Sequence, residues 1–372
     1  MGIMQTELQE KREWMPKQEF VDGLDVVNML PGPGATQLAI FIGHAKAGLI
    51  GGICFIVPAF LIMLALAAAY VAFGTLPSMR NAFYGIGPVV VGIFAASVYR
   101  LGKATVRERS QIVIAVATAV VLFFAPVGLV MPLMAGGCVG IALFDSRRAG
   151  LIALSVLVAG FVIYYEIDKL FFEAVIVSAN PPQRLNTTPP SLWELGAFFF
   201  KVGAFTFGGG LSMLAFIQEQ VVNQFGWLTP KEFVDGLALG QLTPGPILML
   251  AAFVGFKLAG TAGAAVAASM IFMPSFLMML SVLPLLRKLK NLQWLRAFMR
   301  GVGPAVIGAL AVSLIQMAPH AAPDVFTWVL LALTVGIILL RKVGPLPLMA
   351  GGGVIGLLSR GNLIQRLGEF VR

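Results

Sequence analysis

The residues best placed to do chemistry in this sequence are backbone groups at two interruptions within one apolar stretch. Residues 201–246 read KVGAFTFGGGLSMLAFIQEQVVNQFGWLTPKEFVDGLALGQLTPGP, with interruptions at Gly208–Gly210 and Pro244–Pro246. A continuous helix passes through neither, because proline removes a backbone donor and consecutive glycines favour other conformations. A helix that restarts there presents free N–H groups and the positive end of its dipole, which suit an oxyanion. The alternative is that these residues only kink or closely pack membrane helices.

Hydroxyl and amide side chains flank these interruptions and a third one, Pro31–Pro33, which repeats the second. Thr206 precedes the glycines, and Thr243 is expected to N-cap the helix that starts at Pro246. Lys201 lies in an apolar helix before the glycines, where it either supplies positive charge or snorkels to the interface. The predicted substrate-binding residues are Lys201, Thr206, Gly208, Gly209, Gly210, Gln241, Thr243, Pro244, Gly245, Pro246, Asn28, Pro31, Gly32, Pro33 and Gln37.

Four acidic residues are candidates for other roles. Asp22 and Asp235 occupy matching positions on apolar faces, where a carboxylate is costly unless it is paired or hydrated. Each is either a structural ion-pair partner or a coupling group for protons or substrate. Glu219 is the other coupling candidate, although it is also compatible with a place at the membrane surface. For Glu232 we favour a capping box with Thr229.

Motifs of enzymes and metal sites are missing from the sequence. There is no nucleophile elbow, zinc-protease motif, nucleotide-binding loop or dinucleotide fingerprint. The two histidines and two cysteines do not form a zinc-ligand pattern, and Cys54 and Cys138 lie in apolar segments as packing residues. We therefore expect no enzyme activity, no cofactor, no metal and no use of ATP by this chain.

The composition predicts an all-α polytopic membrane protein. Hydrophobic residues make up 58% of the 372 residues and charged residues 12%, whereas soluble domains contain about 25% charged residues. Apolar runs such as 48–73 and 262–285 are long enough to span a bilayer. The net charge of +9 resides in short loops between apolar segments, which is typical of membrane topology rather than of nucleic-acid binding.

Four ordered sequence matches divide the chain into two homologous halves. EFVDGL occurs at 19–24 and 232–237, and PGP follows at the same distance in both copies. Gly-x-Gly-Pro and Pro-Leu-Met-Ala-Gly-Gly also recur in order, a signal of internal repeats. The predicted organisation is a repeat over 1–165, a connecting segment with a Pro-rich linker over 166–190, and a repeat over 191–372. Each repeat is expected to hold about five to six helices.

Loop charges predict that the two repeats are inverted in the membrane. Basic residues follow the Gly-x-Gly-Pro helix in the first half, at 100–109, but precede it in the second half, at 287–300. If basic loops face the cytoplasm, equivalent helices cross the bilayer in opposite directions. The first half is also expected to lack the counterpart of residues 192–210, which leaves its transport competence in doubt.

The sequence resembles the chromate ion transporter family in its long, two-repeat form. The resemblance is carried by FKVGAFTFGGG at 200–210, the duplicated EFVDGL and PGP blocks, and MPSF at 273–276, and it covers nearly the whole chain. It implies a multi-pass protein of the bacterial cytoplasmic membrane that exports chromate and confers resistance to it. The family's glycine motif falls on 207–210 and its PGP motifs on 31–33 and 244–246.

The leading hypothesis is a secondary transporter that exports chromate, driven by the membrane potential with or without proton coupling. The alternatives are a permease for sulfate or another oxyanion, or a truncated membrane protein that transports nothing. The expected partners are a small oxyanion and the lipid bilayer, with no nucleic acid. A homodimer is one possible assembly of the chain.

Overall fold

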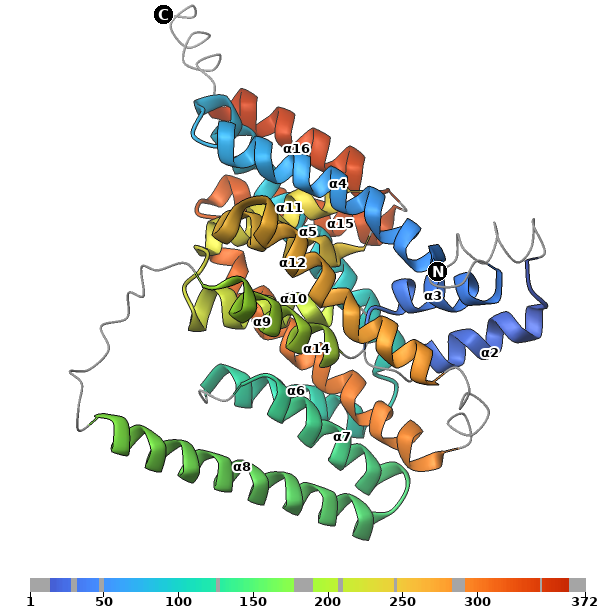
Figure 1. The fold of residues 1–372 in the computed structure, drawn as a ribbon. Coiled ribbons are helices and arrows are strands. Elements are labelled where there is room, and N and C mark those ends of the chain that lie inside the picture. Colours follow the sequence, from blue (N-terminus) through green and yellow to red (C-terminus); the bar gives the residue numbers. More distant parts are fainter. Residues whose placement is uncertain are drawn as a thin grey trace, which may run out of the picture.

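The fold is built from helices alone in the described part of the chain (Figure 1). The structure is a computed structural model that describes residues 14–27, 32–46, 50–124, 128–176, 190–206, 210–243, 246–282, 292–341 and 343–360. The helices are α2 (Lys17–Val27), α3 (Gly34–Lys46), α4 (Ile50–Phe73), α5 (Pro77–Thr105), α6 (Arg109–Phe124), α7 (Val130–Phe144), α8 (Arg147–Ile176), α9 (Leu192–Ala204), α10 (Ser212–Ile217), α11 (Pro230–Leu242), α12 (Leu250–Val282), α14 (Gln293–Ala321), α15 (Val325–Leu340) and α16 (Pro345–Arg360), with a π-helix η2 (Gln218–Gln224) and a 3₁₀-helix η3 (Ile247–Met249).

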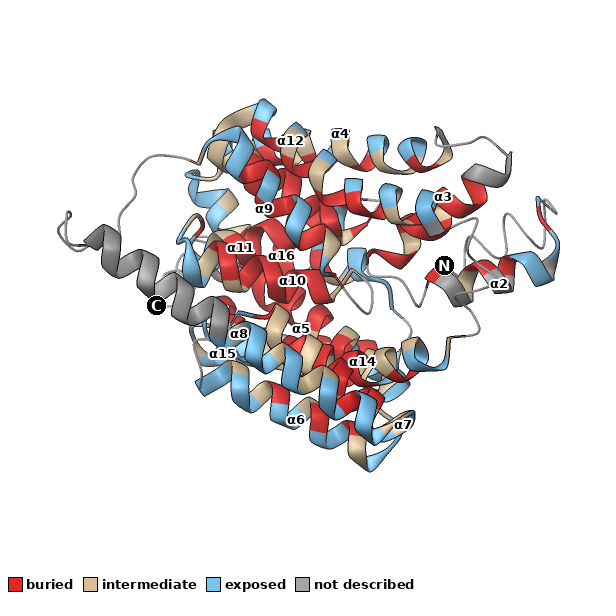
Figure 2. Cartoon of the chain, turned by 60° about the horizontal axis from the view of Figure 1, so that its bottom comes forward, coloured by how far each residue is buried: buried red, intermediate tan, exposed pale blue. Residues whose placement is uncertain are grey.

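Several helices have the length and apolar surface of membrane spans. The stretches 51–73, 77–105, 247–281 and 293–321 are long and apolar enough to cross a bilayer. Large apolar side chains such as Leu61 on α4 are exposed on the outside, while the middle of the bundle is buried (Figure 2). Exposed apolar side chains of this kind are stable against lipid. The prediction of an all-α polytopic membrane protein is confirmed.

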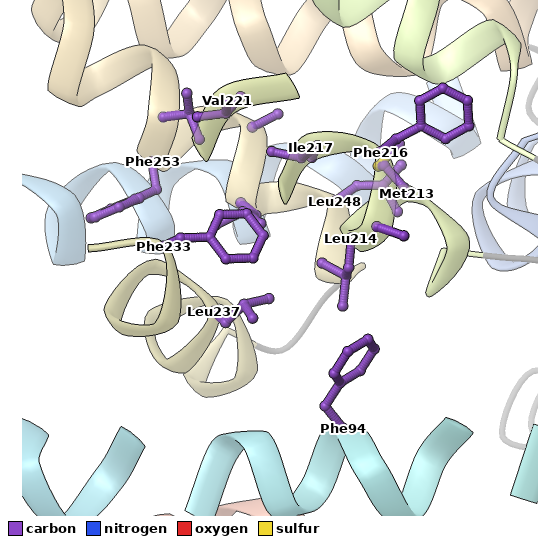
Figure 3. Close-up of a cluster of buried hydrophobic side chains, with 14 of the residues drawn as sticks. Phe94, Met213, Leu214, Phe216, Ile217, Val221, Phe233, Leu237, Leu248 and Phe253 are labelled. Atoms are coloured by element: carbon purple, nitrogen blue, oxygen red, sulfur yellow. The ribbon is translucent and has the colours of Figure 1, made fainter. Parts of the chain in front are cut away.

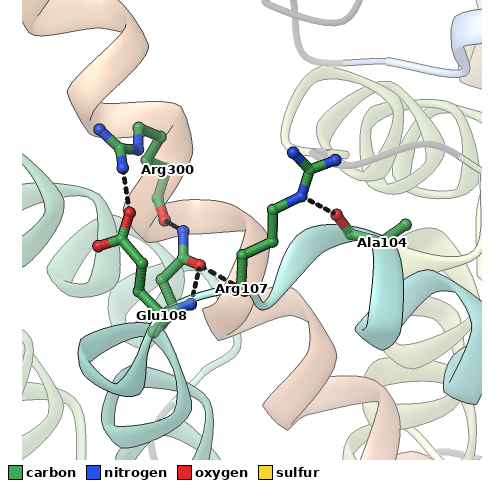
Figure 4. A network of polar contacts seen from close by, with 5 residues as sticks. Ala104, Arg107, Glu108 and Arg300 are labelled. Atoms are coloured by element: carbon green, nitrogen blue, oxygen red, sulfur yellow. Dashed lines mark hydrogen bonds and ion pairs between the residues drawn. The ribbon is translucent and has the colours of Figure 1, made fainter.

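The Gly-x-Gly-Pro helices of the two halves, α5 and α14, run antiparallel. Near the end of α5, Glu108 forms an ion pair with Arg300 at the start of α14, and Gln111 Nε2 donates to the Arg300 carbonyl at 3.3 Å (Figure 4). At its other end, Tyr84 of α5 donates to Asp324, which follows α14. Equivalent helices therefore point in opposite directions, as the loop charges predicted.

Each half packs its Pro-Leu-Met-Ala-Gly-Gly helix against the Gly-x-Gly-Pro helix of the other half. In this exchange α7 lies on α14, and α16 lies on α5. A Cβ at Gly85 would be 2.0 Å from the Gly352 carbonyl oxygen, and one at Gly301 would be 2.1 Å from that of Gly136. Small residues allow membrane helices to approach this closely, which strengthens van der Waals packing where lipid gives no hydrophobic drive.

All three predicted interruptions separate helices in the structure. One break divides α2 from α3, the second divides α9 from α10, and the third divides α11 from η3. A further reversal occurs inside α12, where Ala259 and Gly260 are non-helical. A Cβ at Gly255 would be 2.3 Å from the Gly263 carbonyl oxygen, although residues eight apart in a straight helix are separated by about 12 Å. With this reversal and the short elements η2 and η3, the second half contains more helical segments than the five to six expected.

The predicted boundary at residue 165 lies inside a continuous helix. α8 extends from Arg147 to Ile176, so the first part of the expected connecting segment is helical. The Pro-rich linker at 178–190 falls almost wholly outside the described residues. The boundaries of the two repeats therefore stay a prediction.

We predict that Gly85→Ala lowers the free energy of unfolding by about 1–3 kcal/mol, because the new methyl group overlaps the backbone of α16. Thermal unfolding of the purified protein in detergent measures this loss. The control is Gly351→Ala, since a Cβ there has no described atom within 4 Å. Equal melting temperatures for the two variants would show that the close approach of α5 and α16 contributes nothing.

Candidate functional site

A dense apolar cluster fixes the short helices that flank the second and third breaks. Side chains from α10, η2, α11, η3 and α12 converge in it, among them Met213, Val221, Phe233, Leu248 and Phe253 (Figure 3). These five side chains are essentially inaccessible to solvent. Because helices as short as α10 are not stable alone, burial of this kind holds them in place.

The three breaks adjoin one another. The Gly32 N–H, in the break before α3, donates a hydrogen bond to the Thr206 carbonyl, which follows α9. On the other side of the second break, a Cβ at Gly210 would be 3.0 Å from Leu248 Cδ1 in η3. We call the group Gly32, Thr206, Gly210 and Leu248 the junction. It brings together chain segments from both halves.

Gly32 requires glycine for two independent reasons. Its φ of 126° belongs to a region that side chains disfavour. A Cβ there would also be 2.3 Å from Gln37 Nε2 and 2.8 Å from Ser275 Oγ. Gln37, which the sequence analysis selected, therefore lies at the junction beside the backbone of Gly32.

Two buried hydroxyls near the first break were not predicted. Thr36 belongs to the first turn of α3, and Ser275 lies on α12 next to Gly32. Both side chains are fully buried, and neither Thr36 Oγ1 nor Ser275 Oγ has a hydrogen-bond partner within the described residues. The available signals were the position of Thr36 three residues after Pro33 and the place of Ser275 in MPSF.

The two threonines selected from the sequence use their hydroxyls locally. Thr206 Oγ1 donates to the Val202 carbonyl at 2.6 Å, and Thr243 Oγ1 donates to the Gly240 carbonyl at 2.8 Å. The expectation that Thr243 N-caps the next helix is wrong, because Thr243 ends α11 and Pro246 precedes η3. As donors these hydroxyls are occupied, so each has only acceptor capacity left for a ligand.

The remaining selected residues are dispersed or lie outside the described part. Pro33 and Pro246 are buried, Gln241 is half-buried near the end of α11, and the Lys201 side chain is exposed. Within the described contacts, nothing joins Lys201 to the junction. The residues outside the described part are Asn28, Pro31, Gly208, Gly209, Pro244 and Gly245, together with the side chain of Asp22.

Asp235 borders a polar cavity of about 540 Å³ between α5, α11 and α14. Its buried carboxylate accepts a hydrogen bond from Tyr70 Oη at 2.8 Å, so α4 also contributes to this site. Arg80, Lys231 and His320 line the same cavity. The arrangement combines a carboxylate with positive charge next to enclosed space, which permits hydration as well as pairing.

Glu219 lies on the π-helix η2, in a network of amide side chains. Asn223 Nδ2 donates to Glu219 Oε2 at 2.8 Å and to Gln316 Oε1 at 3.1 Å. Gln218 also bonds Gln316, at 3.3 Å, and these amides line a second cavity, of about 360 Å³. His320 borders this cavity and the Asp235 cavity alike. Of the three predicted coupling carboxylates, Asp235 therefore borders one cavity, and Glu219 bonds Asn223, which lines the other.

Glu232 has the structural role that we favoured. Its side chain and that of Thr229 form a capping box at the start of α11, so this prediction is confirmed. Lys257 adds an ion pair to the same carboxylate at 2.9 Å. Across the described residues, His, Cys, Asp and Glu side chains form no group of three suited to a metal.

Comparison with known proteins matches both halves of the chain. A family model described as chromate transporter matches residues 1–141 and 193–357. The chain belongs to the chromate transporter family. This finding confirms the resemblance inferred from the glycine, EFVDGL and PGP blocks.

Similar members of the chromate transporter family cover most of this chain. The chromate transport protein of Cupriavidus metallidurans is 33% identical across 96% of this chain and 87% of its own length. A probable chromate transport protein of Synechococcus elongatus is 32% identical across 89% and 82%. The chromate transport protein of Pseudomonas aeruginosa is 29% identical across 87% and 77%. No solved structure gives a significant match.

We predict that Tyr70→Phe destabilises this chromate transporter family member by about 1–3 kcal/mol, because it removes a donor from a buried carboxylate. The ring stays, so the edge contacts of Tyr70 with Phe83 and Phe253 are retained. Thermal unfolding at neutral pH measures the effect, with the exposed Tyr99→Phe as control. Stability equal to that of the control would mean that the bond to Asp235 is not formed.

Proposed function

We propose that this protein is a secondary transporter that exports chromate across the bacterial cytoplasmic membrane. Its family and its multi-pass helical fold support transport of a small anion. The observation that carries the site proposal is the junction, where Gly32 of one half bonds to Thr206 of the other. Paired helix breaks in two repeats are typical of binding sites in secondary transporters.

Backbone groups supply the main recognition in this proposal. The first turn of α3 has N–H groups without helical partners and carries the positive end of the helix dipole. Together these favour an oxyanion at the junction. The proposed substrate-binding residues are those selected from the sequence at the three breaks. Among them, Gly32 and Gln37 lie next to each other at the junction.

The membrane potential is a sufficient driving force for export. A dianion that leaves an inside-negative cell gains about 4.6 kcal/mol per 100 mV, since each charge contributes about 2.3 kcal/mol. This free energy corresponds to about three decades of concentration ratio. Export therefore needs neither ATP nor a second ion, and proton coupling through Asp235 or Glu219 is an additional means.

The test is uptake of radiolabelled chromate by everted membrane vesicles, in which export appears as accumulation. We predict that, in the absence of a pH gradient, wild-type vesicles accumulate chromate only under an inside-positive potential, and that Gly32→Ala reduces the initial rate at least about 10-fold. The methyl group would overlap Gln37 and Ser275 and would strain the backbone. Gly336→Ala is the matched control, because a Cβ there has no described neighbour within 4 Å.

Two results contradict this proposal. Absence of uptake by correctly inserted wild-type protein excludes chromate export. Uptake that sulfate competes away at equal or lower concentration assigns the protein to the alternative class of sulfate permeases. Both measurements use the same vesicles and potential.

A second vesicle experiment tests proton coupling. With the potential clamped near zero, we predict that an imposed pH gradient still drives some uptake in the wild type and that Asp235→Asn abolishes this fraction. Uptake driven by potential alone should continue in the variant, because Asp235 lies at a cavity outside the junction. A pH response that persists in Asp235→Asn and disappears in Glu219→Gln would assign coupling to Glu219 instead.

A further inference from the structure

Two hydroxyls near the first break, those of Thr36 and Ser275, lack the hydrogen bonds that buried polar groups normally make. Thr36 Oγ1 and Ser275 Oγ are fully enclosed by protein, yet neither has a partner in the part of the chain that the structure describes. Burial of a hydroxyl without a hydrogen bond costs free energy. Groups of this kind therefore call for an explanation, and a ligand is one that fits their chemistry.

The surroundings of these hydroxyls favour an anion. Thr36 lies in the first turn of α3, a helix of 13 residues whose N–H groups and dipole attract negative charge. Ser275 approaches Gly32, two residues before α3, from α12, with its Oγ 2.8 Å from the position that a Cβ would occupy at Gly32. Gln37 Nε2 lies beside that position as well, at 2.3 Å.

We propose that the hydroxyls of Thr36 and Ser275 donate hydrogen bonds to a tetrahedral dianion bound at the first turn of α3. The inference rests on the proposed transport function and adds to it two ligands that come from separate helices. Hydroxyl, amide and backbone donors surround the oxygens of the anion, so recognition depends on directed hydrogen bonds rather than on a lysine or arginine.

The experiment is equilibrium dialysis of the purified protein in detergent against radiolabelled chromate. Thr36→Val and Ser275→Ala remove one hydroxyl each, and we expect each to weaken binding by about 10- to 100-fold, as for loss of one hydrogen bond to a charged group. Thr36→Ser keeps the hydroxyl and should bind within about 3-fold of the wild type. Since neither hydroxyl has a described protein partner, the melting temperatures of the unliganded variants should equal or exceed that of the wild type.

Matched controls come from the same kinds of residue in other places. Ser281→Ala is on the same helix as Ser275, and its hydroxyl donates to the Leu277 carbonyl at 2.8 Å. Thr334→Val removes a hydroxyl that donates to the Leu330 carbonyl at 2.8 Å. Both controls should bind chromate as the wild type does.

The outcomes separate this inference from the proposed function. Wild-type binding that is unchanged in Thr36→Val and Ser275→Ala overturns the inference and leaves chromate transport standing. A wild type that binds sulfate through Thr36 and Ser275, but not chromate, overturns chromate as substrate and keeps the hydroxyl site. A wild type that binds neither anion overturns both.

Discussion

The structure depends on one constraint, which is that backbone groups at helix breaks must find hydrogen-bond partners within the protein. The hydrogen bond from the Gly32 N–H to the Thr206 carbonyl is an example. A bilayer offers no water to backbone groups, so an interrupted helix persists only where protein satisfies it or where it lines a cavity. Here one break supplies the donor and another supplies the acceptor. The first and second interruptions therefore stabilise each other, and the proposed site lies where they meet.

Apolar packing gives this meeting point its rigidity. The short segments α10, α11 and η3 are buried in one cluster with α12, while the long helices α5 and α14 form the middle of the bundle. The cavities beside Asp235 and Gln218 occupy a different place, between α14 and the elements α5, α11 and η2. In the proposed mechanism, substrate recognition and charge coupling would therefore have separate structural bases in the same bundle.

Much of the fold was predictable because the repeats, glycine motifs and loop charges are local features of the sequence. The three breaks, the antiparallel repeats and the capping role of Glu232 followed from such patterns. The approach of Ser275 to Gly32 did not follow, because the two residues are far apart in sequence and only packing of α12 beside α3 brings them together. The local hydroxyl bonds of Thr206 and Thr243 were also missed, since an N-cap and a helix C-terminus use the same residue types.

The glycine contacts between helices of different halves mean that each half needs the other to cover its helix faces. α7 of the first half packs on α14 of the second, and α16 of the second half packs on α5 of the first. The glycine-lined face of each helix is therefore covered by the other repeat. In a polypeptide with a single repeat, these glycine-lined helix faces would stay uncovered until a second copy of the chain packed against them. Duplication within one gene makes that pairing intramolecular, so assembly of the bundle no longer depends on how many molecules the membrane holds.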